Sequence, residues 1–339
     1  MMQVTEQDEV RRLTVTIMLC NYNDAQFLPS SLNAIGKQTR PADEIIIVDD
    51  GSSDQSVDII EEFAKQQINV KVLRNKENEG LLFSINRALG AATMDFVIWA
   101  AADDMLLPNF VERNLAMLER NPGAAMSFSR LATFRDGTDV ITHYTPEKFH
   151  EEFDLGVRPH YMDVAELNKR FAQSHLWMSA NTVVARRDAL LAIGGFDAKL
   201  RWHADWFAYY VILLRHGACV IPETLAIMRE RPETFSRIGM RSRDQQRRTL
   251  INMVSMLHEP QYNDIRAFIL CRPSILSPYG KHMLYVLLRE PRYWRLAVPF
   301  GRWFLNHWWQ VAAKRKMLGL GRKIWNFFKE MRRQKLIGY

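Results

Sequence analysis

The sequence predicts an α/β fold, in which a doubly wound sheet is flanked by helices and followed by a helical extension rich in basic and aromatic residues. Two patterns carry this prediction. Short apolar runs bounded by polar turns are typical of strands covered on both faces of a parallel sheet, and they alternate with segments of helical periodicity. From residue 291 onward, lysine, arginine and tryptophan become frequent, which sets that part of the chain apart.

The expected sheet elements follow one another from residue 13 to residue 100. The expected strands are residues 13–19, 43–50, 70–73 and 96–100, and the expected helices are residues 27–38, 56–67 and 81–92. The SSD sequence at 52–54 supplies cap residues for the second helix. Because strands and helices alternate, right-handed crossovers would build a parallel sheet whose ligand crevice lies at the carboxyl ends of the strands.

The composition restricts the classes of protein to which the chain can belong. Its 339 residues are 47% hydrophobic and 24% charged, which predicts a globular chain with a large core rather than a disordered one. The three cysteines, Cys20, Cys219 and Cys271, are too scattered for a disulfide framework or a metal site, so we expect core thiols in a reducing compartment. The N-terminus is polar and no run of about 18 apolar residues occurs, so we expect neither secretion nor a membrane span.

Two pairs of adjacent carboxylates follow two of the apolar runs. Asp49 and Asp50 end one expected strand, and Asp103 and Asp104 come after another. Because the carboxyl ends of parallel strands share one edge of a sheet, both pairs would reach the same rim. For each pair alone a structural role is the alternative, since Asp104 could cap the following helix and Asp50 could order a turn. Two pairs at the ends of two buried strands favour a functional role.

Clustered carboxylates in a polar crevice suit a hard divalent cation. Mg²⁺ or Mn²⁺ is often held by one or two carboxylates together with substrate phosphates, so the substrate would contain a diphosphate. The chain lacks the P-loop motif and the G-x-G-x-x-G motif, and its first strand ends instead in CNYND, without the basic glycine-rich loop of a nucleotidyltransferase. In this segment Tyr22 could stack on a nucleobase whose edge bonds to Asp50, or Tyr22 could simply pack locally.

These segments, taken in order, resemble a known family. The nucleotide-sugar half of inverting family 2 glycosyltransferases with the GT-A fold is similar to four segments between residues 13 and 130: LTVTIMLCNYND, FLPSSLNAIGKQTRPADEIIIVDDGSSDQS, NEGLLFSINRALGAATMDFVIWAAADD and MLLPNF. The family's acceptor-side segment, in which a carboxylate followed by a helix supplies the catalytic base, resembles residues 179–217, SANTVVARRDALLAIGGFDAKLRWHADWFAYYVILLRHG. The resemblance implies a GT-A, Rossmann-like mixed sheet flanked by helices.

The resemblance implies roles for five residues. Tyr22 would stack on the nucleobase, and Asp50 would contact its edge. Asp103 and Asp104 would form the Asp-x-Asp-like site for the metal and the ribose, with Mg²⁺ or Mn²⁺ as cofactor. Asp205 would be the general base that takes the proton of the acceptor hydroxyl, while attack from the face opposite to the diphosphate inverts the anomeric centre.

The chain departs from the family's pattern at two positions. Ala101 replaces the first carboxylate of the usual Asp-x-Asp-Asp, and Ala204 replaces the glutamate that usually precedes the catalytic aspartate. These departures leave a second hypothesis open, a catalytically silent GT-A module that binds a nucleotide or a partner. The alternative for Asp205 is an exposed acid at a helix start. His203 would line the same pocket or merely pack, and Arg229 would reach the diphosphate or remain solvated.

The end of the chain carries the positive charge. Residues 291–339 contain twelve Lys/Arg and one acid, Glu330, and five of the nine tryptophans. Basic residues interleaved with Trp and Phe suit a segment lying on an anionic membrane surface. A packed helical hairpin with a solvated basic face and a single-strand nucleic-acid binder are the alternatives, of which nucleic acid is the least favoured.

We therefore expect three regions and one activity. Residues 1–235 would form the GT-A domain, with a nucleotide-sugar half at 13–130 and an acceptor half at 131–235; residues 236–290 would be a helical connector and 291–339 a membrane-surface segment. The expected activity is metal-dependent, inverting transfer of a sugar from a nucleotide-diphosphate donor to a hydroxyl of a glycan or lipid-linked acceptor, in cell-surface polysaccharide synthesis. The expected location is the cytoplasm, peripherally on the inner face of the membrane.

Overall fold

The structure is a computed structural model that divides into two compact units, Met1–Phe268 and Ile269–Tyr339, each described by itself below. It describes residues 12–136, 141–143, 155–172, 174–176, 178–231 and 234–306. The predicted membrane-surface segment therefore lies partly outside the described residues, from 307 to 339.

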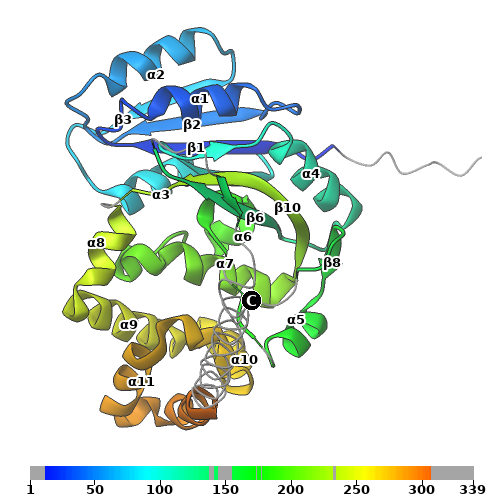
Figure 1. Ribbon diagram of the computed structural model, residues 1–339, viewed down its shortest axis with the longest axis vertical. Helices are drawn as coiled ribbons and strands as arrows, with labels where there is room; N and C mark the ends of the chain where they lie inside the picture. Colours follow the sequence, from blue (N-terminus) through cyan, green and yellow to red (C-terminus); the bar gives the residue numbers. More distant parts are fainter. Residues whose placement is uncertain are drawn as a thin grey trace, which may run out of the picture. The chain divides into compact units, whose positions relative to one another are not determined.

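The first unit begins with strands and helices that alternate as the sequence predicts. They are β1 (Val15–Asn21), α1 (Leu28–Gly36), β2 (Glu44–Asp49), α2 (Ser56–Lys65), β3 (Val70–Arg74), α3 (Leu81–Ala91) and β4 (Phe96–Ala101). β1 pairs in parallel with β2 and with β4, and β2 pairs in parallel with β3 (Figure 1). The expected parallel arrangement is confirmed, and it brings the carboxyl ends of β1, β2 and β4 to one edge of the sheet.

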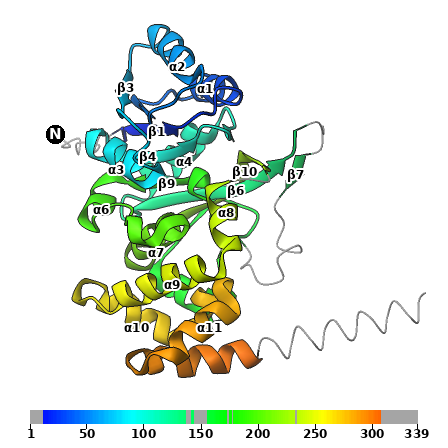
Figure 2. The same ribbon diagram turned by 90° about the vertical axis from the view of Figure 1, so that its left-hand side faces the viewer.

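The rest of the first unit extends the sheet and mixes its strand directions. Its elements are β5 (Met105–Leu106), α4 (Phe110–Arg120), β6 (Met126–Phe134), β7 (Ile141–His143), β8 (His160–Met162), α5 (Val164–Arg170), η2 (Ala180–Thr182), β9 (Val183–Arg186), α6 (Arg187–Ala192), η3 (Ala198–His203), α7 (Ala204–His216), β10 (Ala218–Arg229), α8 (Phe235–Arg241), α9 (Arg243–Leu257), η4 (Pro260–Tyr262) and α10 (Asn263–Cys271). The strand order is β3-β2-β1-β4-β9-β6-β10-β5, with β9 antiparallel to both of its neighbours (Figure 2). The mixed sheet flanked by helices is thus confirmed.

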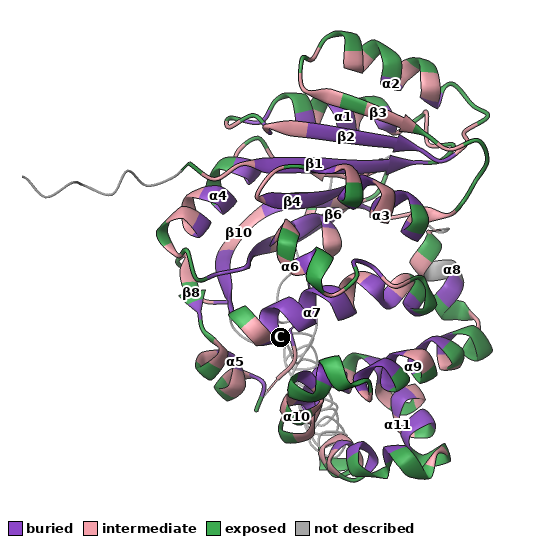
Figure 3. Cartoon of the chain, turned by 180° about the vertical axis from the view of Figure 1, so that it is seen from behind, coloured by how far each residue is buried: buried purple, intermediate pink, exposed green. Residues whose placement is uncertain are grey.

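Burial of the strands follows the apolar pattern except at the edge. Every residue of β1 is buried, and β2 and β4 are buried except at one end (Figure 3). β3 differs from the expectation, because as the edge strand it has a neighbour on one side only and its residues are intermediate or exposed. Cys20 and Cys219 are buried as expected, whereas Cys271 is exposed at the end of α10, so the expectation of a core thiol is wrong there.

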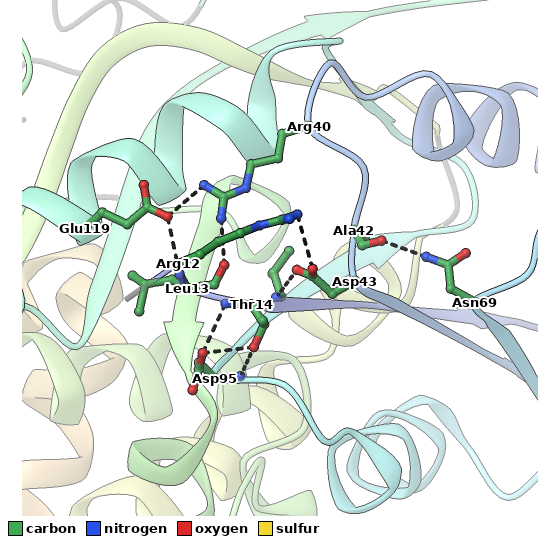
Figure 4. A network of polar contacts seen from close by, with 10 residues as sticks. Arg12, Leu13, Thr14, Arg40, Ala42, Asp43, Asn69, Asp95 and Glu119 are labelled. Atoms are coloured by element: carbon green, nitrogen blue, oxygen red, sulfur yellow. Dashed lines mark hydrogen bonds and ion pairs between the residues drawn. The ribbon is translucent and has the colours of Figure 1, made fainter. Parts of the chain in front are cut away.

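Side chains at the amino edge of the sheet, where β1 and its neighbours begin, hold the first residues of these strands (Figure 4). Asp95 accepts hydrogen bonds from the backbone N–H and the hydroxyl of Thr14, at 3.0 and 2.9 Å. Asp43 accepts the backbone N–H of Val15 at 2.9 Å. These carboxylates satisfy backbone groups that the sheet leaves unpaired, and they lie at the edge opposite to the carboxylate pairs.

The second unit is helical. Beyond the end of α10 it contains η5 (Pro273–Tyr279), α11 (Gly280–Arg289), η6 (Pro291–Tyr293) and a helix at 294–306. The helical character expected for the extension is therefore present as far as residue 306. Within the part of the chain that the structure describes, every helix is too short or too polar to span a bilayer.

The loop after β2 depends on Gly51, which gives a first testable prediction. Gly51 has φ +74°, and a Cβ on it would lie 2.6 Å from the backbone carbonyl carbon of Glu77. Gly51→Ala should therefore lower the free energy of unfolding by roughly 1–3 kcal/mol, measured by urea denaturation of the full chain. Gly90→Ala, in α3, is the control: nothing lies within 4 Å of its added Cβ, so it should not destabilise the protein. Equal effects of the two substitutions would contradict this account.

Candidate functional site

The carboxyl edge of the sheet carries the residues that the sequence singles out. Tyr22 follows β1 and is 45% exposed, so its ring is open to a planar ligand. Asp50 follows β2, while Asp103 and Asp104 come shortly after β4. Because β1 lies between β2 and β4, the two carboxylate pairs occupy the same rim, as the sequence predicts.

Asp104 links three parts of the chain. Its Oδ1 accepts the backbone N–H of Arg229, at the end of β10, at 2.9 Å, and its Oδ2 accepts Nδ2 of Asn181, in η2, at 2.8 Å. Burial, and then the neighbouring charge of Asp103, raises the pKa of Asp104 to about 7. Asp104 does not cap the next helix, because that helix begins at Phe110.

Asp103 faces an arginine that the sequence reasoning did not single out. Nε of Arg231 lies 2.8 Å from Oδ2 of Asp103, and Nη1 of Arg231 donates to Oδ1 of Asp24 at 2.7 Å. This guanidinium joins the loop after β1 to the end of β4. Burial raises the pKa of Asp103, and the positive charge of Arg231 opposes that rise.

Arg229 fixes the turn that carries both carboxylates. Its guanidinium lies over the rings of Phe27 and Phe134, at 4.6 and 4.4 Å from the ring centroids. Its Nε donates to the carbonyl oxygen of Asp103 at 3.1 Å, and its Nη1 is paired with Asp136. At 9% exposure Arg229 is not the solvated arginine of one sequence hypothesis, and its contacts favour a structural role over contact with a diphosphate.

Asp50 orders the loop that precedes α3. Its carboxylate accepts Nδ2 of Asn75 at 2.6 Å and the backbone N–H groups of Glu79 and Gly80, each at 2.9 Å. Asp50 therefore orders the loop before α3 rather than the GSSD turn that follows it, where Asp49 accepts the backbone N–H of Ser52 at 3.1 Å. Since a carboxylate offers about four acceptor positions, roughly one remains for the edge of a nucleobase.

Asp205 lies in the first turn of α7. Its Oδ1 accepts the backbone N–H of Trp206 at 2.7 Å. The residue is half-buried, which disfavours the alternative of an exposed acid at a helix start. Burial raises the pKa of Asp205 to about 6, so the carboxylate is charged at neutral pH and close to the range that suits a general base.

Aromatic contacts connect β4 to the helix that carries Asp205. Trp99 of β4 contacts Phe196 edge-on, with 5.0 Å between ring centroids, and Phe196 contacts Tyr209 of α7 at 5.8 Å. Asn86 holds Phe196 in place, because its amide donates to the carbonyl oxygen of Phe196 at 2.8 Å and accepts the N–H at 2.9 Å. The elements that present the rim carboxylates and Asp205 therefore share one aromatic cluster.

The other candidates near Asp205 have structural contacts. His203 is buried, its Nε2 contacts the amide of Gln246, and burial lowers its pKa to about 4. His203 is therefore neutral at physiological pH and packs against α9. Asp197 caps η3 by accepting the backbone N–H of Lys199 at 2.7 Å.

The donor groups at the rim fit a hard divalent cation. Asp104 accepts two N–H groups and Asp103 is engaged through one oxygen, so each carboxylate retains acceptor positions. Oδ1 of Asn181 is buried without a hydrogen-bond partner among the described residues. The residues that the structure describes contain no cluster of three or more His, Cys, Asp or Glu side chains that could by itself hold a metal ion. Two carboxylates would thus need oxygens from other groups, such as a diphosphate, to complete the shell.

Sequence reasoning missed Asp24, Arg231 and Asn181. Asp24 lies in the CNYND segment beside Tyr22, and Arg231 lies two residues after Arg229, so both were within the motifs considered. Asn181 gave no local signal, because its contact with Asp104 joins residues 77 positions apart.

Solved structures show the same fold. TarS of S. aureus in complex with UDP-GlcNAc matches with a TM-score of 0.60 and 16% sequence identity, over 81% of this chain and 80% of that chain. The mannosyltransferase PcManGT of Pyrobaculum calidifontis, in complex with GDP-Man and Mn²⁺, matches with a TM-score of 0.52 and 17% identity, over 90% of this chain and 87% of that chain. At these identities the likeness concerns the fold alone, which is the GT-A fold that the sequence predicts.

Sequence comparison identifies the family. An uncharacterized glycosyltransferase of Haemophilus influenzae is 34% identical over 107 residues, which are 32% of this chain and 33% of that protein. The match thus spans about a third of that relative's length. The model described as Glycosyl transferase family 2 matches residues 16–187, which is half of the chain. The protein therefore belongs to glycosyl transferase family 2.

Proposed function

We propose that the protein is an inverting glycosyltransferase that moves a sugar from a nucleoside diphosphate sugar to an acceptor hydroxyl. One observation carries the proposal: the rim of the sheet combines the open ring of Tyr22 with a buried carboxylate pair, and an aromatic cluster connects this edge to the helix of Asp205. Membership of the family supports the activity. The two similar structures are described as complexes with nucleotide sugars, which supports the class of donor.

The donor nucleotide would bind along the rim. Tyr22 would stack on the nucleobase, and the remaining acceptor position of Asp50 would take a hydrogen bond from the edge of the base. Arg231 would direct its positive charge to the diphosphate, since its side chain is 24% exposed while Arg229 is buried. A cation fixed beside the leaving group stabilises the charge that develops there.

Asp103 and Asp104 would hold Mg²⁺ or Mn²⁺. When bound, such an ion neutralises negative charge on the departing diphosphate. The Mn²⁺ in the complex of PcManGT supports a metal in this fold. Because the pKa of Asp104 is raised to about 7, protons would compete with the cation below that pH.

Asp205 would take the proton of the acceptor hydroxyl. Its carboxylate is unprotonated above about pH 6 and is held in the first turn of α7 by the N–H of Trp206. Attack from the face opposite to the diphosphate would invert the anomeric centre. The acceptor would be a glycan or a lipid-linked sugar, as in the synthesis of a cell-surface polysaccharide.

The second unit has a face that suits a membrane surface. In the helix at 294–306, Trp294, Val298 and Leu305 are 55%, 71% and 54% exposed, and their spacing puts them on one side of the helix. Phe300 lies on another side of the helix and is fully buried. The helix therefore has two apolar sides: the side of Phe300 is packed, and the side of Trp294, Val298 and Leu305 is exposed.

The surface around this helix is positively charged. Four exposed arginines lie in or near the helix: Arg289, Arg292, Arg295 and Arg302. Apolar residues flanked by cations suit the interface of an anionic bilayer, where each cation contributes roughly 1 kcal/mol. We therefore propose that the protein acts at the cytoplasmic face of a membrane, where a lipid-linked acceptor would be presented.

The role of Asp205 predicts a pH-dependent loss of activity. Asp205→Asn should lower turnover by about 10²–10⁴-fold, because an amide does not accept the proton. In the wild type, turnover should fall as the pH drops below about 6. This acidic limb of the pH–turnover profile should be absent from the variant. Release of the nucleoside diphosphate during transfer measures both. Asp197→Asn is the control and should keep the limb; turnover of Asp205→Asn equal to wild type would place the base elsewhere.

The same substitution should stabilise the fold. The pKa of Asp205 is about 6 in the folded chain against 3.8 as its ordinary value, so the stability that protonation provides is complete below about pH 4 and lost as the pH rises through 6. Asp205→Asn should therefore raise the Tm at pH 7.5 but hardly at pH 4. A lower Tm at neutral pH would show that the charged carboxylate has a stabilising partner.

The role of Asp104 predicts a specific loss of metal-dependent binding. Asp104→Asn keeps the shape of the side chain but removes its charge, so the gain in affinity for nucleoside diphosphates that Mn²⁺ provides should fall by roughly 10-fold or more. Calorimetry with a panel of nucleoside diphosphates, with and without Mn²⁺, measures this gain. Asp188→Asn, at an exposed carboxylate near the opposite edge of the sheet, should leave it unchanged. An equal gain in Asp104→Asn and wild type would remove Asp104 from the metal site.

The face of the second unit predicts binding to anionic vesicles. The triple substitution Trp294→Ser, Val298→Ser, Leu305→Ser should abolish cosedimentation of the full chain with vesicles of phosphatidylcholine and phosphatidylglycerol. Wild-type binding should weaken as salt rises and be low on phosphatidylcholine alone. Ile68→Ser, at a fully exposed apolar residue of the first unit, is the matched control. Binding by the triple variant equal to that of the control would refute the proposal.

A further inference from the structure

Asn181 is a buried residue of the rim whose hydrogen bonds are incomplete. It is 3% exposed, and its Nδ2 donates to Oδ2 of Asp104 at 2.8 Å. Its Oδ1 is fully enclosed and has no hydrogen-bond partner among the residues that the structure describes. A buried acceptor without a partner costs free energy, so the chain keeps this oxygen for a reason other than stability.

The two ends of the amide are interchangeable in shape. A half-turn of the Asn181 amide places Oδ1 where Nδ2 lies, against Oδ2 of Asp104. In the absence of a cation two acceptors would then repel each other. A divalent cation beside them would take both oxygens as ligands; Oδ1 would gain a partner, and Nδ2 would give up its hydrogen bond to Asp104.

The observed distance suits such an arrangement. Mg²⁺ and Mn²⁺ favour octahedral shells, and ligands at neighbouring corners of an octahedron with bonds of roughly 2.0–2.1 Å are roughly 2.9 Å apart. In the structure 2.8 Å separates Nδ2 of Asn181 from Oδ2 of Asp104, and a half-turn of the amide would bring Oδ1 to about the position of Nδ2. The two oxygens would therefore span one edge of the shell without movement of the backbone.

The backbone at Asn181 is held by the sheet. η2 runs directly into β9, which pairs with both β4 and β6, and the hydroxyl of Thr182 donates to the carbonyl oxygen of Ser179 at 2.8 Å. Rotation of the side chain is thus the motion available at this position. A ligand on a rigid element is the arrangement that fixes the position of an ion well.

We propose that Asn181 is a direct ligand of the divalent cation, next to Asp104. This inference rests on the metal of the proposed function. It would bring SANTVV, the start of the acceptor-side segment at 179–217, into the coordination shell of the donor's cation, so both halves of the domain would contribute to one site.

The test measures coordination rather than turnover. The full chain, with asparagine labelled with ¹³C at the side-chain carbonyl, is loaded with Mn²⁺ and UDP and examined by electron–nuclear double resonance. A ligated amide should give a resolved ¹³C hyperfine coupling, which should vanish in Asn181→Ala. The affinity of Asn181→Ala for Mn²⁺ in the presence of UDP should fall by roughly 10- to 100-fold.

A control separates ligation from loss of a buried amide. Asn114→Ala removes a buried asparagine that is bonded to the carbonyl oxygen of Phe110 and the hydroxyl of Ser127, away from the rim. It should keep both the coupling and the affinity for Mn²⁺. Because the wild-type spectrum is itself a readout, the inference remains testable even if Asn181→Ala folds poorly.

Two outcomes would overturn the inference. Wild-type protein that binds Mn²⁺ without the ¹³C coupling would make Asn181 a positioning residue that only orients Asp104. A coupling that persists in Asn181→Ala would belong to another asparagine. Neither outcome would touch the proposed sugar transfer, which is tested separately by release of the nucleoside diphosphate, and absence of any Mn²⁺ binding would remove the metal and the ligand together.

Discussion

Two adjacent carboxylates at the buried end of a strand are the constraint on which the rest of the site depends. Burial raises the pKa of both Asp103 and Asp104, and the charge of Asp103 raises that of Asp104 further. Three groups stabilise the charged carboxylates: the guanidinium of Arg231, a backbone N–H of β10 and the amide of Asn181. These groups come from two distant parts of the sequence, the end of β10 with the residues after it and η2, so the need to neutralise one pair of charges brings both to the end of β4.

The two edges of the sheet differ in how completely their charges are satisfied. At the amino edge, Asp43 and Asp95 accept backbone N–H groups, and these contacts close the edge. At the carboxyl edge, the pKa of Asp104 is about 7 in spite of its two hydrogen bonds. Its negative charge is therefore only partly stabilised by the groups around it. A ligand that supplies this charge binds the folded chain alone and therefore stabilises it. The cation of the proposed function would therefore offset the free energy that the fold loses at this edge.

The sequence predicts the fold well because its evidence is local. The apolar runs of β1, β2 and β4 and the alternation with helices are readable within a few residues, and the carboxylate pairs mark the ends of two of these strands. The exposure of β3 depends on its place at the edge of the sheet, which the pattern of a single strand does not contain. The partners of the carboxylates are harder still, because Asn181 and Arg231 meet them only through pairing of distant strands. The sequence therefore predicts where the carboxylates of the site lie, whereas the side chains that contact them become known only from the fold.

The two departures from the family's pattern follow from the same electrostatics. Ala101 is paired with Cys20 in β1, and its carbonyl oxygen accepts the hydroxyl of Ser31 at 2.9 Å, so an aspartate there would add a third carboxylate beside the pair. Such a charge would raise the pKa of Asp104 further and favour its protonated form. A glutamate in place of Ala204, which is 1% exposed, would do the same to the neighbouring Asp205. Alanine at both positions keeps the remaining carboxylates nearer to the charged state that the proposed metal ligand and general base would require.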